Sequence, residues 1–340
     1  MPEALLQQKL DDDKVRCGVC AHRCIIASSQ RGVCGVRENQ DGTLYTLNYS
    51  KVIAHNIDPI EKKPLYHFLP GTQSYSIATV GCNFRCQNCQ NADIAQSNPA
   101  GLFSKTSAIP GQAMPPKAVV EEALRHNCQS IAYTYTEPTI FLEYALDTMK
   151  LAQASGLKNI FVSNGYMTAA TTKLLVPYLN AINIDLKAFN NETYRKVCGA
   201  KLQPVLDTLK LMKKNKVWVE VTSLIIPTVN DSSKEIAALA NFITTELGSE
   251  TPWHLSRFHP AHKMTDAPST PIKKLHETYS LGKKAGLKYV YVGNVPDDKL
   301  QNTLCPRCDE LAIERHGIMA ERYDKDGKCR ECGESLDIVN

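Results

Sequence analysis

The 340-residue sequence lacks the features of a membrane protein, an exported protein or a disordered chain. No apolar stretch approaches the roughly 20 residues that a membrane-spanning helix needs. The first residues lack the basic and then apolar segments of a secretory signal. Low-complexity tracts are absent, and 43% hydrophobic with 22% charged residues is typical of folded domains. The net charge of +4 is scattered rather than striped, which argues against a nucleic-acid partner. We expect a cytoplasmic protein that binds neither membrane nor nucleic acid.

Cysteine, in contrast, is abundant. In a chain without an export signal, thirteen cysteines are metal ligands more often than disulfides. Eleven of them form three groups, and only Cys128 and Cys198 stand alone. The N-terminal tetrad is Cys17, Cys20, Cys24 and Cys34, the three-Cys loop holds Cys82, Cys86 and Cys89, and the C-terminal tetrad is Cys305, Cys308, Cys329 and Cys332.

Between the three-Cys loop and the C-terminal tetrad, β-rich runs alternate with amphipathic stretches of helical length. Such alternation implies parallel strands, and six or seven units favour an open or closed barrel over a flat sheet. The sequence therefore predicts an α/β fold with three parts: a Cys-rich metal-binding cap over residues 1–69, a (β/α) barrel core over 70–297, and a four-Cys tail over 298–340. The predicted strands are 74–80, 130–135, 159–163, 181–186, 218–224, 253–258 and 289–292, and the main predicted helices are 117–127, 139–154, 204–214, 234–246 and 272–285.

The three-Cys loop has the spacing C-x₃-C-x₂-C and follows the first predicted barrel strand. Three thiolates can hold three irons of a cubane cluster and leave the fourth iron open. An open iron can coordinate a substrate or cofactor, whereas a plain electron carrier needs a fourth Cys nearby. None follows before Cys128. The alternative is a zinc site completed by a distant His, but the position at a barrel strand end favours the cluster.

This loop and the strand ends after it resemble the radical S-adenosylmethionine (SAM) superfamily. Each short motif alone is weak evidence, but together they occur in the family's order at the carboxyl ends of successive predicted strands. The second strand ends in Tyr135-Thr136-Glu137-Pro138, the third in Ser163-Asn164-Gly165, and the fourth in Asp185-Leu186-Lys187, and Ile225–Asp231 follows the fifth.

The resemblance implies a partial (β/α) barrel of the TIM type and a [4Fe–4S] cluster on the three-Cys loop, whose open iron chelates SAM. By their positions, Thr136 and Glu137 would meet the SAM amino group, Asn164 the ribose, and Asp185 with Lys187 the carboxylate. Glu137 can also be read as a strand-end cap, and Lys187 as a solvated loop charge.

The sequence departs from the family pattern at two places. Asn88 stands where many members carry an aromatic residue before the third Cys. Val162-Ser163 stands where activating enzymes of glycyl-radical proteins often have Asp-Thr. The second departure leaves the role of Asp185 open.

Over almost the whole chain, the sequence is similar to the radical SAM component of the AmmeMemoRadiSam system, whose members are often described as relatives of pyruvate formate-lyase activating enzymes. The similarity lies in the N-terminal Cys spacing, in Asp58–Leu65, Trp253–Pro260 and Tyr291–Pro296, and in the closing C-x₂-C pairs. It implies Memo-like and Amme-domain proteins as companions, and a flavodoxin or ferredoxin as electron donor. It does not imply a substrate, which could be a protein or a small molecule.

The two tetrads differ in how strongly their spacing points to one metal. Two C-x₂-C pairs separated by twenty residues in the C-terminal tetrad predict a zinc ribbon, in preference to an auxiliary iron–sulfur cluster. A tail of this length cannot build its own core, so the metal would supply its folding free energy. The N-terminal spacing, C-x₂-C-x₃-C-x₉-C, leaves Zn²⁺ and an auxiliary iron–sulfur cluster equally open.

Two further groups are weaker candidates for catalysis. Cys198 follows the fourth strand and could give a hydrogen atom to a substrate radical, although a buried apolar Cys is the commoner case. We expect His254, His259 and His262 to cluster after the sixth strand, at the barrel end where active sites lie. Of these, His259 is the candidate for proton transfer, with a hydrogen-bonded loop residue as the alternative.

The function that these patterns favour is that of a radical SAM enzyme: reductive cleavage of SAM at a [4Fe–4S] cluster gives a 5′-deoxyadenosyl radical, which abstracts hydrogen from a substrate. The first alternative is an activase that installs a glycyl radical on a partner enzyme. A second is an iron–sulfur electron carrier, which would have no use for polar groups at the strand ends. A third is a zinc-stabilised scaffold, which would be colourless.

Overall fold

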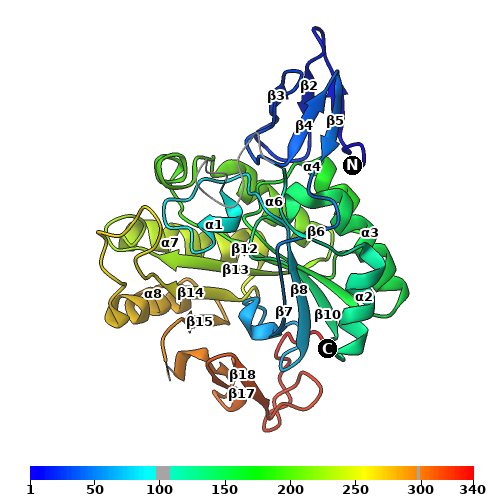
Figure 1. Ribbon diagram of the computed structural model, residues 1–340. Helices are drawn as coiled ribbons and strands as arrows, with labels where there is room; N and C mark the ends of the chain where they lie inside the picture. Colours follow the sequence, from blue (N-terminus) through cyan, green and yellow to red (C-terminus); the bar gives the residue numbers. More distant parts are fainter. Residues whose placement is uncertain (97–107, 297–298) are drawn as a thin grey trace.

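The centre of the molecule is one eight-stranded sheet (Figure 1). The computed structural model describes residues 1–96, 108–296 and 299–340. The sheet contains β7 (Ala54–Pro59), β8 (Gln73–Ala78), β10 (Ser130–Tyr133), β11 (Lys158–Ser163), β12 (Ala181–Asp185), β13 (Trp218–Ile225), β14 (Trp253–Arg257) and β15 (Val290–Gly293).

The strand order is β15-β14-β13-β12-β11-β10-β8-β7. The strands from β8 to β15 run parallel, and β7 pairs antiparallel with β8 at one edge. Because β7 and β15 are the two edges, the arrangement is an open, partial (β/α) barrel, as predicted. All seven predicted strands are present, and their bounds differ from the predicted ones by at most two residues.

Helices connect the parallel strands, and each helix packs on the sheet by burying one apolar face against it. In α2 (Pro116–Arg125), for example, Val119, Val120 and Ala123 are buried and the charged residues face outward. No helix in the described ranges is long and apolar enough to cross a membrane. The other α-helices are α1 (Ala92–Ala95), α3 (Leu142–Ala154), α4 (Ala169–Leu175), α5 (Asn191–Thr193), α6 (Gln203–Lys214), α7 (Ser233–Phe242) and α8 (Ile272–Lys284); 3₁₀ turns cover Ile60–Lys62, Pro138–Phe141 and Lys299–Gln301, and π-helical turns cover Tyr194–Cys198 and Ile243–Leu247.

The N-terminal segment lies over the carboxyl ends of the barrel strands (Figure 1, blue). The Thr168 hydroxyl, after β11, donates to the Gly18 carbonyl at 2.7 Å, and Ala21 N–H donates to the Tyr166 carbonyl at 3.1 Å. These contacts place the N-terminal tetrad at the edge where barrel enzymes build active sites. The short strands here are β1 (Gln7–Lys9), β2 (Val15–Cys17), β3 (Ile25–Ile26), β4 (Arg37–Gln40), β5 (Thr43–Thr46), and β6 (Lys51–Val52), which pairs with β9 (Gln112–Ala113).

The C-terminal tail lies against the opposite, amino edge of the sheet (Figure 1, orange and red). It forms the antiparallel sheet β16 (Thr303–Leu304), β17 (Leu311–His316) and β18 (Met319–Arg322). Val339 N–H donates to the His67 carbonyl at 2.8 Å, and Arg315 Nη2 donates to the Tyr66 carbonyl at 2.8 Å. The two Cys-rich ends therefore cover opposite edges of the barrel.

The predicted cap contributes a strand to the central sheet, because β7 falls within residues 1–69 and pairs along its length with β8. The 3₁₀ turn after β7 leads directly to the segment that receives the C-terminal tail. The division of the chain into three domains at residues 69 and 297 remains a prediction.

A buried carboxylate organises the amino edge of the barrel. Glu220, in β13, accepts from the backbone N–H groups of Tyr66 and His67, both at 2.9 Å, and from Trp218 Nε1 at 2.9 Å. Its Oε2 also lies 2.6 Å from His254 Nε2. His254 is therefore buried in β14 near the amino ends of the strands, and the prediction that it clusters with His259 and His262 at the barrel mouth is wrong. His254 is the second residue of both the predicted strand 253–258 and the observed β14, so in a parallel barrel it lies at the amino end of the strand, away from the mouth.

His67 makes the stability of this edge sensitive to acid. Its Nδ1 lies 3.0 Å from the Leu336 carbonyl and its Nε2 lies 2.6 Å from the Tyr291 hydroxyl, and burial lowers its pKa to about 4. A depressed pKa stabilises the fold above the unfolded value near 6.5 and loses that stabilisation as the pH falls toward 4. Between pH 7.5 and 5, the free energy of unfolding should fall by about 2 kcal/mol more in the wild type than in His67→Gln. Denaturant titrations of both proteins measure the difference, and equal pH slopes would contradict the assignment.

Candidate active site

The three-Cys loop begins at a glycine that no other residue can replace. Gly81 follows β8 with φ +104°, and a Cβ there would lie 2.8 Å from the Cys34 carbonyl oxygen and 2.9 Å from Val36 Cγ1. Both the backbone conformation and the close approach require glycine. The residue before Cys82 thus packs directly on the N-terminal tetrad.

The loop presents three free thiols and unsatisfied polar atoms. Cys86 is buried, whereas Cys82 and Cys89 are half-buried. Burial raises the pKa of Cys82 well above its usual value, so its thiolate requires a compensating cation. The Asn83 Nδ2 and Asn88 Oδ1 atoms are buried without a hydrogen-bond partner among the described residues. Three thiols with orphaned polar atoms beside them fit the predicted [4Fe–4S] cluster, whose irons take thiolate ligands.

At the end of β10, Glu137 is fully engaged by the protein. Its Oε1 accepts from Thr139 N–H at 3.0 Å, from the Thr139 hydroxyl, and from Ser163 Oγ at 2.8 Å, while its Oε2 accepts from Asn164 N–H at 2.8 Å. A carboxylate has about four acceptor sites, so little capacity is left for another donor. Glu137 joins the end of β10 to the end of β11, and its contact with SAM remains a prediction. The neighbouring Thr136 hydroxyl donates to the Thr79 carbonyl at 2.8 Å.

Asn164, after β11, faces the three-Cys loop. Its Nδ2 donates to Asn83 Oδ1 at 2.7 Å and lies 3.9 Å from Cys82 Sγ, and its Oδ1 accepts from Tyr166 N–H at 3.0 Å. The predicted cofactor residue at this strand end is therefore brought next to the predicted cluster ligands. Its contact with SAM stays a prediction.

At the end of β12, Asp185 and Lys187 form an ion pair, with Lys187 Nζ 2.9 Å from Asp185 Oδ2. Burial alone would lower the pKa of Lys187, but Asp185 and the thiols of Cys86 and Cys198 raise it well above the usual value. Lys187 is thus a positive charge directed toward the three-Cys loop. Asn230 holds this strand end by donating from Nδ2 to the Lys187 carbonyl at 2.7 Å.

Cys198 lies beside a predicted cluster ligand, a position that its sequence context did not indicate. It is buried, and its thiol hydrogen-bonds to Cys86. This hydrogen bond and the charge of Lys187 outweigh burial and lower the pKa of Cys86 to about 7. The Cys198 carbonyl also accepts from Arg85 N–H at 2.8 Å. A role as hydrogen-atom donor stays a prediction, but Cys198 lies where it can modify the electronic properties of the Cys86 ligand.

His259, the other weak catalytic candidate, is exposed, and its Nδ1 lies 3.1 Å from Ser269 Oγ. The loop that carries it nevertheless reaches the site, because Lys263 N–H donates to the Gln87 carbonyl at 2.8 Å. His259 thus lies on a loop that contacts the three-Cys loop, and its role in proton transfer stays a prediction.

Tyr135 is a strained residue at the mouth of the site. It has φ +61°, a conformation that costs free energy for a bulky side chain. Its hydroxyl donates to Asp58 Oδ2, and Asp58 also forms a buried ion pair with Lys63 at 2.6 Å. The ion pair joins two charged residues of the Asp58–Leu65 motif, and the Tyr135 hydrogen bond links Asp58 in β7 to the segment after β10.

Two side chains that the sequence analysis missed tie the three-Cys loop to the N-terminal tetrad. Arg85 donates from Nη2 to the Val33 carbonyl and from Nη1 to the Cys82 carbonyl at 2.8 Å. His22 Nε2 lies 2.7 Å from the Asn83 carbonyl oxygen. Each residue lies within a Cys motif, and this position could have marked it as part of the site. Its hydrogen-bond partner could not be predicted, because the partners are 52 and 61 positions away in the sequence.

The N-terminal tetrad lines one narrow cavity together with Arg37. Burial raises the pKa of Cys34 to about 11 and also raises the pKa of Cys17 and Cys20. Buried thiols of this kind become thiolates when a metal compensates the charge. The four predicted ligands are therefore brought together as the spacing implied.

The C-terminal tetrad is more compact. The Sγ atoms of Cys305 and Cys332 are 3.6 Å apart, as are those of Cys308 and Cys329. All four sulfurs lie within 4.8 Å of one another. A tetrahedral zinc with Zn–S bonds of 2.3 Å places its sulfurs about 3.8 Å apart, so one ion fits this tetrad.

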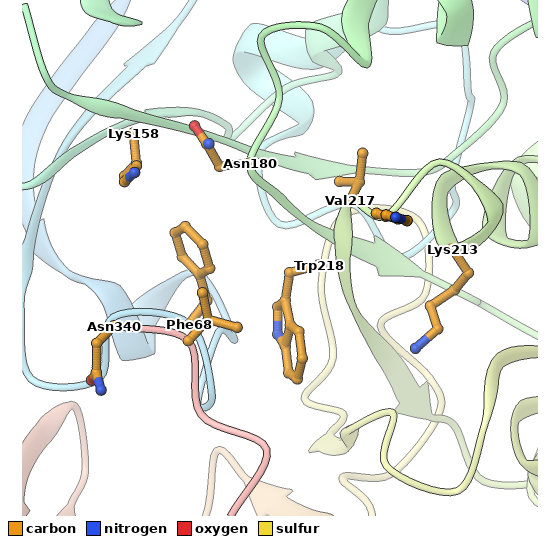
Figure 2. Close-up of a pocket in the computed structure, with 9 residues that line it drawn as sticks. Phe68, Lys158, Asn180, Lys213, Val217, Trp218 and Asn340 are labelled. Carbon is orange, nitrogen blue, oxygen red and sulfur yellow. The ribbon is translucent and has the colours of Figure 1, made fainter. Parts of the chain in front are cut away.

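A separate pocket lies at the amino edge of the sheet (Figure 2). Phe68, Trp218 and the C-terminal Asn340 line it beside Lys158, at the start of β11. Because it lies at the strand ends opposite the three-Cys loop, it is not part of the predicted reaction site.

Comparison with known proteins agrees with this geometry. Residues 76–240 match the model of the radical SAM superfamily. Over 342 residues the chain is 48% identical to an uncharacterised protein of Methanocaldococcus jannaschii, with all of both chains covered. It is 24% identical to the pyruvate formate-lyase-activating enzyme of Clostridium pasteurianum over 169 residues, which is 48% of this chain and 66% of that one.

Among solved structures, a radical SAM methyltransferase from Sphaerobacter thermophilus matches with a TM-score of 0.49 and 11% identity, over 70% of each chain. The matched family region contains the three-Cys loop and the strand ends from β10 to β13, which carry the predicted SAM contacts. The chain belongs to the radical SAM superfamily.

Proposed function

We propose that the protein is an enzyme that reductively cleaves SAM and uses the resulting radical to abstract hydrogen from a substrate. The observation that carries the proposal is the position of Cys82, Cys86 and Cys89 at the carboxyl edge of the sheet, beside Asn164 and Lys187. A [4Fe–4S] cluster held by these thiols would supply the one electron that cleaves the bond between sulfur and C5′ of SAM, giving methionine and a 5′-deoxyadenosyl radical able to take a hydrogen atom from a substrate C–H bond, and an external reductant would return the electron to the cluster.

The residues of the chain would hold and orient this chemistry. The three thiols would ligate three irons and leave one position for SAM. The Lys187 ammonium offsets negative charge at Cys86, and the Asn164 amide holds Asn83 beside Cys82. Glu137 fixes the Asn164 backbone, so we place Glu137 as a positioning residue and Thr136, Asn164, Asp185 and Lys187 as the groups nearest SAM.

The remaining cofactors and partners follow from the same assignment. We propose Zn²⁺ at the C-terminal tetrad, where the sulfur spacing fits one ion. A flavodoxin or ferredoxin would supply the electron, and Memo-like and Amme-domain proteins are the proposed companions. Free thiols and thiolate-bound metals persist in a reducing compartment, which favours the cytoplasm.

A glycyl-radical activase is the second candidate, favoured by the similarity to the pyruvate formate-lyase-activating enzyme. The two candidates differ in the source of the abstracted hydrogen. An activase takes it from a glycine Cα–H of a partner protein, whereas the enzyme of the first proposal takes it from a substrate other than such a glycine.

The wild-type protein should form 5′-deoxyadenosine when it is reconstituted anaerobically with iron and sulfide, reduced with dithionite and incubated with SAM. Mass spectrometry measures the product against the same protein without reductant and against protein loaded with zinc only. Because one-electron reduction starts the cleavage, both controls should give the background of a protein-free reaction. If the protein holds its cluster, forms no product with candidate substrates present and does not bind SAM in a titration, the electron-carrier alternative is favoured.

A further inference from the structure

The two tetrads differ in the separation of their sulfurs. Within the described part of the chain, the C-terminal tetrad is the only group of three or more His, Cys, Asp or Glu whose ligand atoms all lie within 4.8 Å of one another. Any three sulfurs of the N-terminal tetrad therefore include a pair that is farther apart. A single tetrahedral zinc would bring all four to about 3.8 Å from one another. The N-terminal tetrad is wider than a mononuclear site.

The three-Cys loop provides an internal reference for this wider spacing. Cys82, Cys86 and Cys89 also fail to lie within 4.8 Å of one another, although all three are described. In a polynuclear cluster each thiolate binds a different iron, so the sulfurs stand farther apart than around one ion. The N-terminal tetrad shares this property with the loop whose superfamily carries a cluster.

A second, independent observation points to an anionic group in the N-terminal cavity. Arg37 lines that cavity and is only 2% exposed. Its Nη2 pairs with Glu143 Oε2 at 2.6 Å, but its Nε and Nη1 are buried without a hydrogen-bond partner in the described ranges. Unsatisfied donors of a buried guanidinium are costly unless an acceptor fills the space beside them. The sulfides and thiolates of a cluster are such acceptors, and hydrogen bonds to the sulfurs tune a cluster's potential.

The cavity also lies next to the predicted reaction site. The Cys34 carbonyl touches Gly81, Arg85 bonds to the Val33 carbonyl, and His22 bonds to the Asn83 carbonyl. Val19, Ile26 and Ile140 provide apolar walls, which limit access of water to a bound cluster. A redox group in this cavity would therefore lie beside the three-Cys loop, since the segments that carry the two Cys groups are in direct contact.

We infer that Cys17, Cys20, Cys24 and Cys34 bind a second [4Fe–4S] cluster, to which Arg37 donates hydrogen bonds from Nε and Nη1. All four irons then carry thiolates and none is open to SAM, so the cluster transfers single electrons and does not bind a substrate through iron. The electron would come from a low-potential one-electron carrier and pass to the three-Cys loop. This relay role rests on the proposed function, whereas the presence of the cluster does not.

The test measures metal and sulfide in the full chain after anaerobic reconstitution with ⁵⁷Fe. The wild type should hold about eight irons and as many acid-labile sulfides, four for each cluster, beside one zinc. The triple variant Cys82→Ala, Cys86→Ala, Cys89→Ala should keep about four of each, with the Mössbauer spectrum of a [4Fe–4S] cluster. The double variant Cys20→Ser, Cys24→Ser leaves two thiolates in the N-terminal tetrad, too few to hold a cubane, so it should lose the N-terminal cluster while keeping the other.

The outcomes separate the possible metals. Two zincs and about four irons in the wild type would overturn the inference, as would iron without sulfide in the triple variant, which marks mononuclear Fe(Cys)₄. The double variant Arg37→Met, Glu143→Met removes the buried pair together. It should lower the midpoint potential of the cluster in the triple-variant background, since the hydrogen bonds from Arg37 Nε and Nη1 to the cluster sulfurs are lost while the net charge is unchanged. None of these readouts depends on SAM cleavage, so a failure of the proposed function would leave them unchanged.

Discussion

Cys86→Ala is expected to reduce 5′-deoxyadenosine formation to the level of a protein-free reaction. Cys86 is the most buried thiol of the three-Cys loop, and it is surrounded by Cys198 and Lys187, which lower its pKa to about 7. Its loss removes one of three thiolates, and two thiolates on one loop do not hold a cubane cluster. The product is measured by mass spectrometry after reduction with dithionite, and loop-bound iron by Mössbauer spectroscopy.

The matched control is Cys128→Ala. Cys128 is also buried, but it precedes β10 at the amino edge of the sheet, away from the three-Cys loop. We expect it to retain cluster and product, with a loss of about 1 kcal/mol or more in stability because one buried sulfur is removed. Product formation by Cys86→Ala, with its iron still bound at the loop, would contradict the assignment of Cys86 as a ligand.

The barrel was predictable because its signals are local. Parallel strands buried on both faces read as short β-rich runs, and the helices between them read as amphipathic periods. The carboxyl ends of such strands meet at one edge, so motifs distant in the sequence could be assigned to one site. Asn164 beside Cys82 confirms that step of the reasoning. The helix α4 was missed because it is short and rich in Thr, whose helix propensity is low.

Contacts between distant side chains could not be predicted. Arg37 and Glu143 are 106 positions apart, and neither residue type signals a buried pair. The thiol contact between Cys198 and Cys86 depends on how the π-helical turn at 194–198 meets the loop after β8. The two hydrogen bonds that Glu137 accepts from Ser163 and Asn164 likewise appear only when β10 and β11 are placed side by side.

The C-terminal tail should unfold when the proposed zinc is removed. Its core is small and includes two of its own cysteines, Cys305 and Cys329. Structural zinc contributes about 10 kcal/mol or more to the folding of comparable small motifs, far more than this core can provide. Cys308→Ser changes the exposed member of the C-terminal tetrad and leaves that core intact, yet we expect it to abolish stoichiometric zinc binding.

Unfolding of the tail should also expose the amino edge of the barrel. The Leu69 N–H donates to the Val339 carbonyl at 2.7 Å, and His67 Nδ1 faces the Leu336 carbonyl. Hydrogen exchange of Cys308→Ser should therefore show lost protection over residues 303–322 and at Leu69, while β10 to β13 stay protected. The control Ile318→Ser alters an exposed apolar residue of the same tail and should keep both its zinc and its protection. A tail that stays protected without zinc in Cys308→Ser would mean that docking against the barrel, rather than the metal, supplies its folding free energy.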